Sequence, residues 1–389
     1  MKILNIAWEA FGLDDIKEAF ETEGHRVTDF PFSKRENAVD NPKVEKQFCS
    51  VLHEEAPDLV FSFDYYPVFS KTCQSENIRY VAWVYDNPQI LLYSDTVQNS
   101  CNRIFVFDKG EYLKFRSQGI RTVHYLPLAV NVDRLDHLVQ GGLPYRYNIS
   151  FVGSFYVEEV SYFDQMEGRL SPYSKGYLDA LIVAQRKIQG YNLIEESLEP
   201  VIEDLYKVLP VHMGQENKAT KEYFYAHYVI DRKITSIERI DLISAVASEH
   251  TVDLYTLVKD FKIPNVRNHG AVDPYTGAPF VYNQSRINLN ITLRSIERGI
   301  PLRAFDIMGA GGFLLSNYQA DLLEMFVPGE EFVYYENKED LLRKVDYYLI
   351  HEDERKAIAK NGHDKVAAAH TYRHRVREMF SVLEGQDCG

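Results

Sequence analysis

Short apolar runs and amphipathic segments alternate from the first residues onward. KILNIAW, at residues 2–8, is a mainly apolar run that predicts a buried strand, and GLDDIKEAFETEGH behind it repeats apolar residues at helical spacing. Asp14 and Asp15 fall in the first turn of this predicted helix, and Gly24 falls where a terminating glycine belongs. The chain therefore opens with a strand followed by a helix.

The same alternation continues to about residue 140. Five further apolar runs predict strands: HRVTDFPF (25–32), DLVFSFD (58–64), RYVAWVYD (79–86), RIFVFD (103–108) and VHYLPLA (123–129). Strands that alternate with helices favour a parallel sheet with right-handed crossovers. We therefore expect an α/β domain over residues 1–140, which ends at the pair Gly141–Gly142.

A second α/β domain is expected over residues 146–370. Its first strand is predicted at YNISFVGS (147–154), and later strands at TVDLYT, INLNITL, FLLSN and EFVYYE. Between the first two of these strands, over about 159–250, glycines are few and apolar positions repeat at helical spacing. This stretch predicts a helical insertion in the second domain.

Length, charge and cysteine spacing narrow the class of protein. A chain of 389 residues suits two domains, and a net charge of −14 argues against a protein that coats nucleic acid. The apolar windows are broken by charges, so no membrane span is expected, and MKILNIAWEAFG lacks the layout of a signal peptide. Far-apart cysteines with no CxxC pair indicate free thiols in a cytoplasmic protein and no zinc site: Cys49, Cys73, Cys101 and Cys388.

Four predicted strands end in acids: Glu9, Asp64, Asp86 and Asp108. Ligands of open α/β sheets bind outside the carboxyl ends of the strands, so we expect at least one of these acids to face a ligand. For any one acid alone, a cap on the following helix is the favoured interpretation.

The segment ERGIPLRAFDIMGAGGFLLSN, at residues 297–317, carries the clearest chemistry. Pro301 suits the start of a helix, whose free N–H groups and dipole of roughly half a positive charge attract a phosphate. Arg303 adds donors in the first turn, and Asp306 lies on the same face, where it can accept hydrogen bonds from two ribose hydroxyls. The glycines then allow a tight turn into the next strand. Together these features predict a nucleotide site, although a surface ion pair between Arg303 and Asp306 fits the spacing equally well.

Several strings resemble CgeB-like glycosyltransferases. INLNITLRSIERGIPLRAFDIMGAGGFLLSN and HEDERKAIAKNGHDKVAAAHTYRHR are similar to their C-terminal domain, and YNISFVGS is similar to its opening. YVAWVYDNP and VFDKGEYLKF resemble the N-terminal domain often found with it, as does VHYLPLAVNVDRL. The resemblance implies a bacterial enzyme with a GT-B fold, in which two Rossmann-like domains face each other across a cleft. It also implies that the nucleotide-sugar binds the C-terminal domain, the acceptor binds the N-terminal domain, and a last helix within 371–389 returns to the N-terminal domain.

Two positions depart from related retaining enzymes. Asp306 stands where those enzymes place Glu, and Arg298, beside Glu297, stands where they carry a second Glu near the sugar. The stereochemical outcome and the identity of the sugar therefore stay open.

The expected reaction is metal-independent transfer of a sugar from a nucleoside-diphosphate sugar, most simply a UDP-sugar, to a hydroxyl of a glycan, protein or cell-surface polymer. Arg294, Arg303 and the helix N-terminus would stabilise the leaving diphosphate. Asp86, with Glu9 and Asp64 as alternatives, would deprotonate the acceptor if the reaction inverts. No cofactor is expected, and a homo-oligomer is possible.

Loops on the donor side complete the candidate site. They hold Gly153, Ser154, His269, Gly270 and Gly299.

Three rival functions stay open: a GT-B nucleotide-sugar epimerase, a non-catalytic nucleotide-binding module that Arg298 would favour, and a dinucleotide oxidoreductase. The last is disfavoured because EAFGLDD, and not a G-x-G-x-x-G turn, follows the first strand.

Overall fold

The computed structural model describes residues 1–389 except 34–38, 140–142, 158–160, 214–216 and 386–389. The chain forms two compact units. Unit 1 comprises Met1–Ala129, His212–Thr220 and Tyr372–Gly389, and unit 2 comprises Val130–Val211 and Lys221–Thr371. The expected boundary pair Gly141–Gly142 lies outside the described residues.

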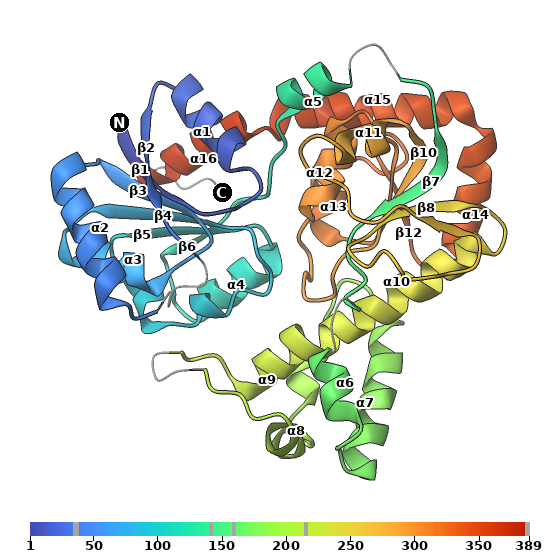
Figure 1. Cartoon of the computed structure of the whole chain (residues 1–389), viewed down its shortest axis with the longest axis horizontal. Helices are drawn as coiled ribbons and strands as arrows, with labels where there is room; N and C mark the ends of the chain where they lie inside the picture. Colours follow the sequence, from blue (N-terminus) through green and yellow to red (C-terminus); the bar gives the residue numbers. More distant parts are fainter. Residues whose placement is uncertain (34–38, 140–142, 158–160, 214–216, 386–389) are drawn as a thin grey trace. The chain divides into compact units, whose positions relative to one another are not determined.

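Unit 1 is built on a six-stranded parallel sheet with the strand order β2-β1-β3-β4-β5-β6 (Figure 1). Its strands are β1 (Lys2–Ala7), β2 (Arg26–Pro31), β3 (Leu59–Phe63), β4 (Arg79–Val84), β5 (Asn102–Val106) and β6 (Val123–Tyr125). Its helices are α1 (Leu13–Thr22), α2 (Pro42–Glu55), α3 (Pro67–Ser75), α4 (Lys109–Ser117) and α16 (Tyr372–Leu383), with short 3-10 turns at η1 (Ile90–Leu92) and η2 (Asp95–Gln98). The strand order reverses between β1 and β3, and ligands of doubly wound sheets bind at such a switch point.

The last helix, α16, packs against α1 in unit 1. Glu23 pairs with Arg373 at 3.1 Å and with Arg377 at 2.9 Å. At the start of α16, the hydroxyl of Tyr85 donates to that of Tyr372 over 2.9 Å. Helix α16 is therefore fixed to the rest of unit 1 by ion pairs with Glu23 and by the edge-on contact of Tyr372 with Trp83.

Unit 2 contains a second six-stranded parallel sheet, with the strand order β12-β11-β10-β7-β8-β9. Its strands are β7 (Tyr147–Val152), β8 (Val252–Tyr255), β9 (Val266–Asn268), β10 (Ser285–Asn290), β11 (Leu314–Asn317) and β12 (Val333–Tyr335). The helices outside the insertion are α5 (Val132–Leu138), α11 (Ala278–Asn283), α12 (Leu302–Gly309), α13 (Ala320–Met325), α14 (Lys338–Ile350) and α15 (Glu352–Ala369). When the strands of this unit are numbered from its own first strand, β7, their order is that of the Rossmann fold. The switch point of the sheet lies between β7 and β10.

The predicted helical insertion is present between β7 and β8 (Figure 1). It contains α6 (Tyr162–Glu167), α7 (Pro172–Gln185), η3 (Glu195–Ser197), α8 (Ile202–Val208), α9 (Lys221–Phe224), a π-helical turn η4 (Tyr225–Ile230) and α10 (Asp231–Ala247). A separate apolar cluster holds these helices together, and it includes Met166, Leu205 and Tyr225.

One part of the insertion belongs to unit 1. Residues 212–220 join unit 1 through an antiparallel bridge between Ser94 and Asn217, and the Lys218 amide donates to the carbonyl of Tyr93. The predicted α/β class, with two Rossmann-like sheets and a helical insertion, is confirmed.

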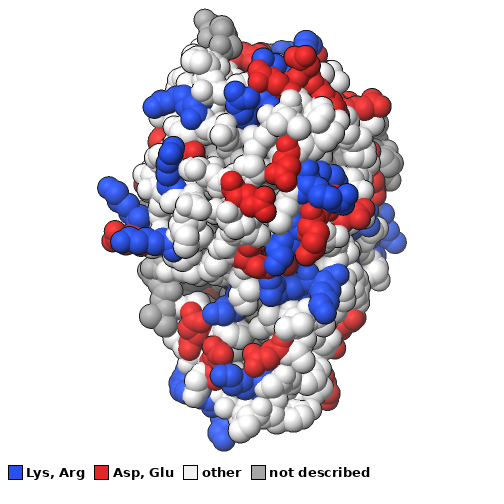
Figure 2. Space-filling model, turned by 90° about the vertical axis from the view of Figure 1, so that its right-hand side faces the viewer, with Lys and Arg blue, Asp and Glu red and all other residues white. Residues whose placement is uncertain are grey.

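The surface carries charges of both signs. Figure 2 shows one face of the molecule, on which Lys and Arg side chains lie among Asp and Glu side chains. In the part of the chain that the structure describes, every helix is too short or too polar to cross a lipid bilayer.

Candidate nucleotide site

Helix α12 begins at the edge of the second sheet where the carboxyl ends of its strands meet. Pro301 is its N-cap, and no side chain caps its first turn. Before the helix, the carbonyl of Gly299 accepts a hydrogen bond from the Gln319 side chain over 3.1 Å. Gly299 is buried, so the loop before the helix is held against the unit. The first amides of α12 and the positive end of its dipole are thus fixed beside the β7/β10 switch point.

Arg303 points from the first turn of α12 into this switch point. Its Nη1 donates to Oδ1 of Asn290, at the end of β10, over 3.0 Å. The guanidinium lies 5.0 Å from the ring centre of Phe151 on β7. Burial lowers the pKa of Arg303. The side chain is therefore a half-buried cation held by Asn290, and not the surface ion-pair partner that the spacing also allowed.

Asn290 is itself fixed, which sets the position of Arg303. Its Nδ2 donates to Oγ of Ser316 over 2.9 Å and to Oγ1 of Thr292 over 3.1 Å. The amide oxygen is thereby turned toward the guanidinium. Three neighbouring segments, at the ends of β10 and β11 and the start of α12, hold the arginine in one orientation.

Gly153 lies immediately after β7 and faces Arg303. Its amide continues the pairing with β8 by donating to the carbonyl of Tyr255 over 2.9 Å. A Cβ atom at this position would lie 2.6 Å from Nη2 of Arg303, too close for the guanidinium to stay. The glycine therefore makes room for the cation. Ser154 beyond it uses its hydroxyl to accept the Tyr156 amide over 2.9 Å.

Arg239, on α10, is a second cation at the same place, and it is buried. Its Nε and Nη2 donate to the carbonyl of Ile291 over 3.1 and 2.6 Å, and its Nη1 donates to the carbonyl of Ser154. Burial, together with the nearby charge of Arg303, lowers the pKa of Arg239 to about 10. Nothing in the local sequence ERIDLIS distinguishes this residue from an ordinary helical arginine.

Arg239 and Arg303 together make the site electropositive. Within the described ranges, their hydrogen bonds go to neutral oxygen atoms of Ser154, Tyr156, Asn290 and Ile291. Holding a buried and a half-buried like charge together without a carboxylate bonded to either is costly, and an anion would offset that cost. A diphosphate at the N-terminus of α12 has the required charge and acceptors.

Asp306 lies one turn further along α12 and is partly buried. Burial raises the pKa of Tyr282, on the neighbouring helix α11, and the charge of Asp306 raises it further. The same carboxylate favours the charged form of Arg303. The structure therefore brings Arg303 and Asp306 to one side of α12, as the spacing predicted.

Arg294 is placed near the switch point but its donors are occupied. Its Nε and Nη2 donate to the two carboxylate oxygens of Glu238 over 2.8 and 2.5 Å, and its Nη1 donates to the carbonyl of Ile188 over 2.9 Å. Burial opposes the charge of Arg294, but the bonds with Glu238 raise its pKa. Contact between this guanidinium and a diphosphate would require the pair to open.

His269 and Gly270 follow β9, at the same carboxyl edge of the sheet. Nε2 of His269 lies 2.7 Å from Oδ1 of the buried Asp253, and the imidazole stacks on Tyr255 at 4.7 Å. Gly270 has a φ of 80° and its carbonyl accepts the Thr256 amide over 3.0 Å. The two residues thus shape a loop beside the ends of β8 and β9.

Arg298, which replaces an expected acid, is bound to other acids. Its Nε lies 3.2 Å from Oδ1 of the buried Asp321, and its Nη2 lies 2.6 Å from Oε1 of Glu324. Both partners are on α13. The arginine therefore anchors that helix to the loop before α12.

Two of the strand-end acids in unit 1 serve the backbone. Asp64 is buried, and its Oδ1 accepts the amides of Tyr85 and Asp86, each over 3.0 Å. Asp108 caps α4 by accepting the Gly110 amide over 2.8 Å. The capping interpretation is confirmed for Asp108, while Asp64 holds the turn that follows β4.

The other two strand-end acids, Glu9 and Asp86, are exposed. They follow β1 and β4, and Nε1 of Trp8 donates to the carbonyl of Phe63 over 3.1 Å, which ties the ends of β1 and β3 together. Both carboxylates therefore stand at the carboxyl edge of the first sheet, where a ligand could meet them.

A cavity of about 560 Å³ lies among α6, η4 and α10 in unit 2. Its lining includes Tyr156, Tyr162, Tyr228 and Arg232. Nζ of Lys233, also in the lining, pairs with Asp164 at 2.7 Å. Aromatic faces and a cation make this cavity suitable for a polar ring such as a sugar.

Comparison with known proteins adds a family match over part of the chain. Residues 239–381 match the family described as glycosyl transferase-like. The matched segment begins at Arg239 and contains Arg303 and Asp306. The comparison with curated proteins gave no match.

Solved structures with the same fold cover nearly the whole chain. Sucrose-phosphate synthase (tll1590) from Thermosynechococcus elongatus has 12% identity and a TM-score of 0.55 over 99% of this chain and 98% of its own. A glycosyltransferase from Rickettsia africae ESF-5 gives the same values. Anabaena Alr3699/HepE, solved in complex with UDP-glucose, has 11% identity and a TM-score of 0.55 over 99% of this chain and 100% of its own. The fold is therefore GT-B, and the match and the fold together support a glycosyltransferase.

Proposed function

We propose that this chain is a CgeB-like glycosyltransferase that moves a sugar from a nucleoside-diphosphate sugar to a hydroxyl group without a metal ion. One observation carries the proposal. The buried Arg239 and the half-buried Arg303 place two positive charges, bonded to neutral oxygens, beside the N-terminus of α12 at the switch point of the second sheet. A diphosphate supplies the charge that this arrangement lacks.

The donor binds with its diphosphate against Arg303 and the first turn of α12. Asp306, one turn further along, accepts hydrogen bonds from the two ribose hydroxyls. The shorter side chain of Asp, compared with Glu, requires the ribose to lie closer to the helix. A UDP-sugar is the donor we favour, and HepE, which shares the fold, has been solved with UDP-glucose.

Transfer breaks the bond between the anomeric carbon and the diphosphate oxygen, and a bond from that carbon to the acceptor oxygen forms. The two arginines stabilise the charge that develops on the leaving diphosphate, so no metal is required. If the reaction inverts, the acceptor proton passes to Asp86 or Glu9, whichever comes within hydrogen-bond distance of the acceptor hydroxyl. The acceptor class is a glycan, a protein or a cell-surface polymer.

The identity of the donor is tested by thermal unfolding in the presence of UDP, GDP, dTDP, CMP and NAD. We expect one nucleoside diphosphate, UDP, to raise the unfolding temperature, because it binds only the folded state. Stabilisation by NAD alone would instead favour a dinucleotide enzyme.

Product analysis with a labelled donor then separates the remaining functions. Label in a new glycoside identifies a transferase, and label in an isomerised sugar without an acceptor identifies an epimerase. Binding without any product would identify a nucleotide-binding module, for which the pairing of Arg298 with Asp321 is the favouring observation. The same assay in excess EDTA tests metal independence, because loss of turnover that Mg²⁺ or Mn²⁺ restores would contradict it.

A further inference from the structure

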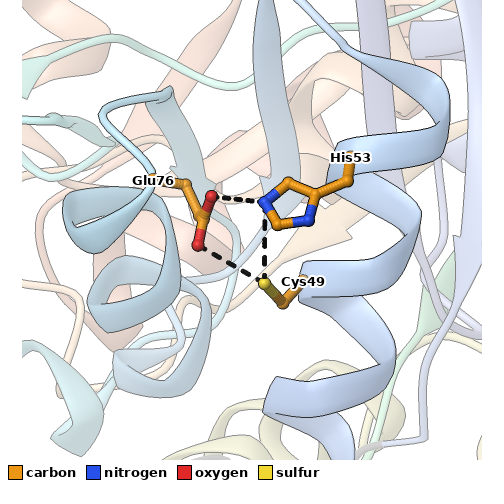
Figure 3. A group of neighbouring side chains, drawn as sticks. All are labelled: Cys49, His53 and Glu76. Carbon is orange, nitrogen blue, oxygen red and sulfur yellow. Dashed lines mark hydrogen bonds and ion pairs between the residues drawn. The ribbon is translucent and has the colours of Figure 1, made fainter.

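Cys49, His53 and Glu76 form a compact cluster between two helices of unit 1 (Figure 3). Cys49 and His53 lie one turn apart on the same face of α2, and Glu76 is the C-cap residue of α3. Their potential metal-ligand atoms, which are the Cys49 sulfur, a His53 ring nitrogen and a Glu76 carboxylate oxygen, all lie within 4.8 Å of one another. The helices that carry them are in contact.

The carboxylate of Glu76 bridges the other two side chains, as Figure 3 shows. The Cys49 thiol donates to Oε1 of Glu76 over 3.3 Å, and Nε2 of His53 lies 2.7 Å from Oε2. The sulfur and Nε2 are 3.9 Å apart. All three potential ligand atoms therefore point toward one small volume.

The geometry suits a tetrahedral metal ion after a small adjustment. Zinc binds thiolate sulfur at about 2.3 Å and nitrogen or oxygen at about 2.0–2.2 Å, so neighbouring ligand atoms lie about 3.3–3.6 Å apart. The sulfur-to-oxygen distance already matches. The nitrogen-to-oxygen distance of 2.7 Å must lengthen by about 0.6 Å, and the sulfur-to-nitrogen distance of 3.9 Å must shorten by about 0.3 Å. His53, with 66% of its side chain exposed, has room for this movement.

We infer that Cys49, His53 and Glu76 bind a divalent transition-metal ion of the zinc class. The ion replaces the thiol proton, which is released to solvent, takes neutral imidazole and carboxylate as further ligands, and keeps one position for water. A set of one sulfur, one nitrogen and one oxygen favours Zn²⁺ or Co²⁺ over Mg²⁺ or Ca²⁺. The ion joins the end of α2 to the end of α3.

This metal site lies away from the residue of unit 1 that we assign to sugar transfer. Helix α2 leads into β3 and α3 leads into β4, so Cys49, His53 and Glu76 lie toward the amino ends of those strands. The exposed Asp86 stands at their carboxyl edge. Removal of the ion should therefore leave turnover unchanged, and the metal site does not depend on the proposed function.

Cobalt provides the direct test, because a cobalt–thiolate bond gives a charge-transfer absorption that other ligands do not. Reduced, metal-free full-length protein is titrated with Co²⁺. We expect one ion per chain, an absorption typical of four-coordinate cobalt bound to sulfur, and bleaching of that absorption by added Zn²⁺. Wild-type protein that shows no thiolate absorption in a large excess of Co²⁺ would overturn the inference.

Variants assign the absorption to the three ligands. Cys49→Ser should abolish the thiolate absorption, and His53→Ala and Glu76→Gln should each weaken cobalt binding by at least about tenfold. Cys101→Ser is the matched control, since the Cys101 thiol donates to the carbonyl of Ser70 and to Asn102. An absorption that survives Cys49→Ser, or that Cys101→Ser removes, would overturn the inference. Unchanged circular dichroism confirms that each variant is folded.

Discussion

Gly153 and Arg303 fit together only because Gly153 has no side chain. A Cβ atom on Gly153 would lie 2.6 Å from Nη2 of Arg303 and 3.2 Å from its Cζ. The guanidinium occupies the space directly after β7, where a side chain would otherwise stand. The arginine that we assign to the diphosphate is therefore positioned by an interlock, in which its guanidinium fills the space left by the missing side chain of Gly153. The two residues are 150 positions apart in the sequence.

We predict that Gly153→Ala weakens nucleoside-diphosphate binding. The methyl group would push the guanidinium away from Asn290 and from the phosphate position. The expected loss is about tenfold or more, since a charge-assisted hydrogen bond contributes about 1.5–3 kcal/mol. Calorimetric titration measures the affinity. Gly176→Ala on α7 is the control, because a Cβ there meets no neighbour within 4 Å. Equal affinities for the two variants would show that the interlock does not serve the nucleotide.

Asp306→Asn should reduce discrimination by the ribose hydroxyls. A carboxylate can accept from both hydroxyls, whereas an amide offers only one oxygen as an acceptor. We expect wild-type protein to bind UDP more tightly than its 2′,3′-dideoxy form and Asp306→Asn to bind the two nucleotides almost equally. Competition titration compares them. If the variant keeps the wild-type preference, Asp306 does not contact the ribose.

Asp86→Asn should lower turnover and leave donor affinity nearly unchanged. Asn cannot take the acceptor proton, but Asp86 is exposed and the turn that carries it is held through its amide by Asp64. Steady-state assays and nucleotide titration separate the two effects, with Glu9→Gln as the matched comparison at the end of β1. Parallel loss of turnover and affinity would assign Asp86 to a structural role.

The stability of the insertion should depend on the protonation of His227. Burial alone would lower the pKa of His227, but hydrogen bonds with Asp231 and Glu195 raise it from 6.5 to about 9. Nδ1 lies 2.8 Å from Asp231, and Nε2 lies 3.1 Å from Glu195. Because the folded pKa is the higher one, the contribution is fully present below about pH 6.5 and is lost as pH rises through about 9.

We therefore predict that His227→Gln lowers the free energy of unfolding most at pH 6, by on the order of 3 kcal/mol. The difference from wild type should shrink steadily above pH 8 and become small at pH 10. Urea unfolding at several pH values measures it. A difference that stays constant from pH 6 to pH 10 would mean that His227 contributes through packing and not through its charge.

Much of the fold follows from local patterns. The apolar run at residues 2–8 contains β1, and the helical spacing behind it places Ile16, Ala19 and Phe20 of α1 in the core. Strand ends were less predictable. The run at residues 123–129 gives a strand only over Val123–Tyr125, because Pro127 has no amide to donate to a sheet.

The candidate site was predictable only where its residues are neighbours in the chain. Arg303 and Asp306 share one helix, so their spacing placed them on one face. Arg239 comes from α10, and only the folded chain brings its guanidinium to Ser154 and Ile291. The partner of Arg294 is likewise distant, since Glu238 precedes it by 56 residues. Residues 212–220 join unit 1 through contacts that periodicity does not reveal.

The proposed metal site at Cys49, His53 and Glu76 was likewise not predictable from the sequence alone. A search for paired cysteines finds no zinc motif in this chain. Cys49 and His53 have the one-turn spacing of two ligands on a helix, but the third ligand, Glu76, is supplied by the packing of α3 beside α2.

The affinity of UDP for wild-type protein and for Arg303→Ala, measured by isothermal titration calorimetry, tests the central claim most directly. Removal of the guanidinium should delete a charge-assisted hydrogen bond of about 1.5–3 kcal/mol, so we predict roughly 10- to 150-fold weaker binding with little change in the unfolding temperature of the free protein. If UDP binds both proteins with the same affinity, Arg303 does not contact the diphosphate and the N-terminus of α12 is not the nucleotide site.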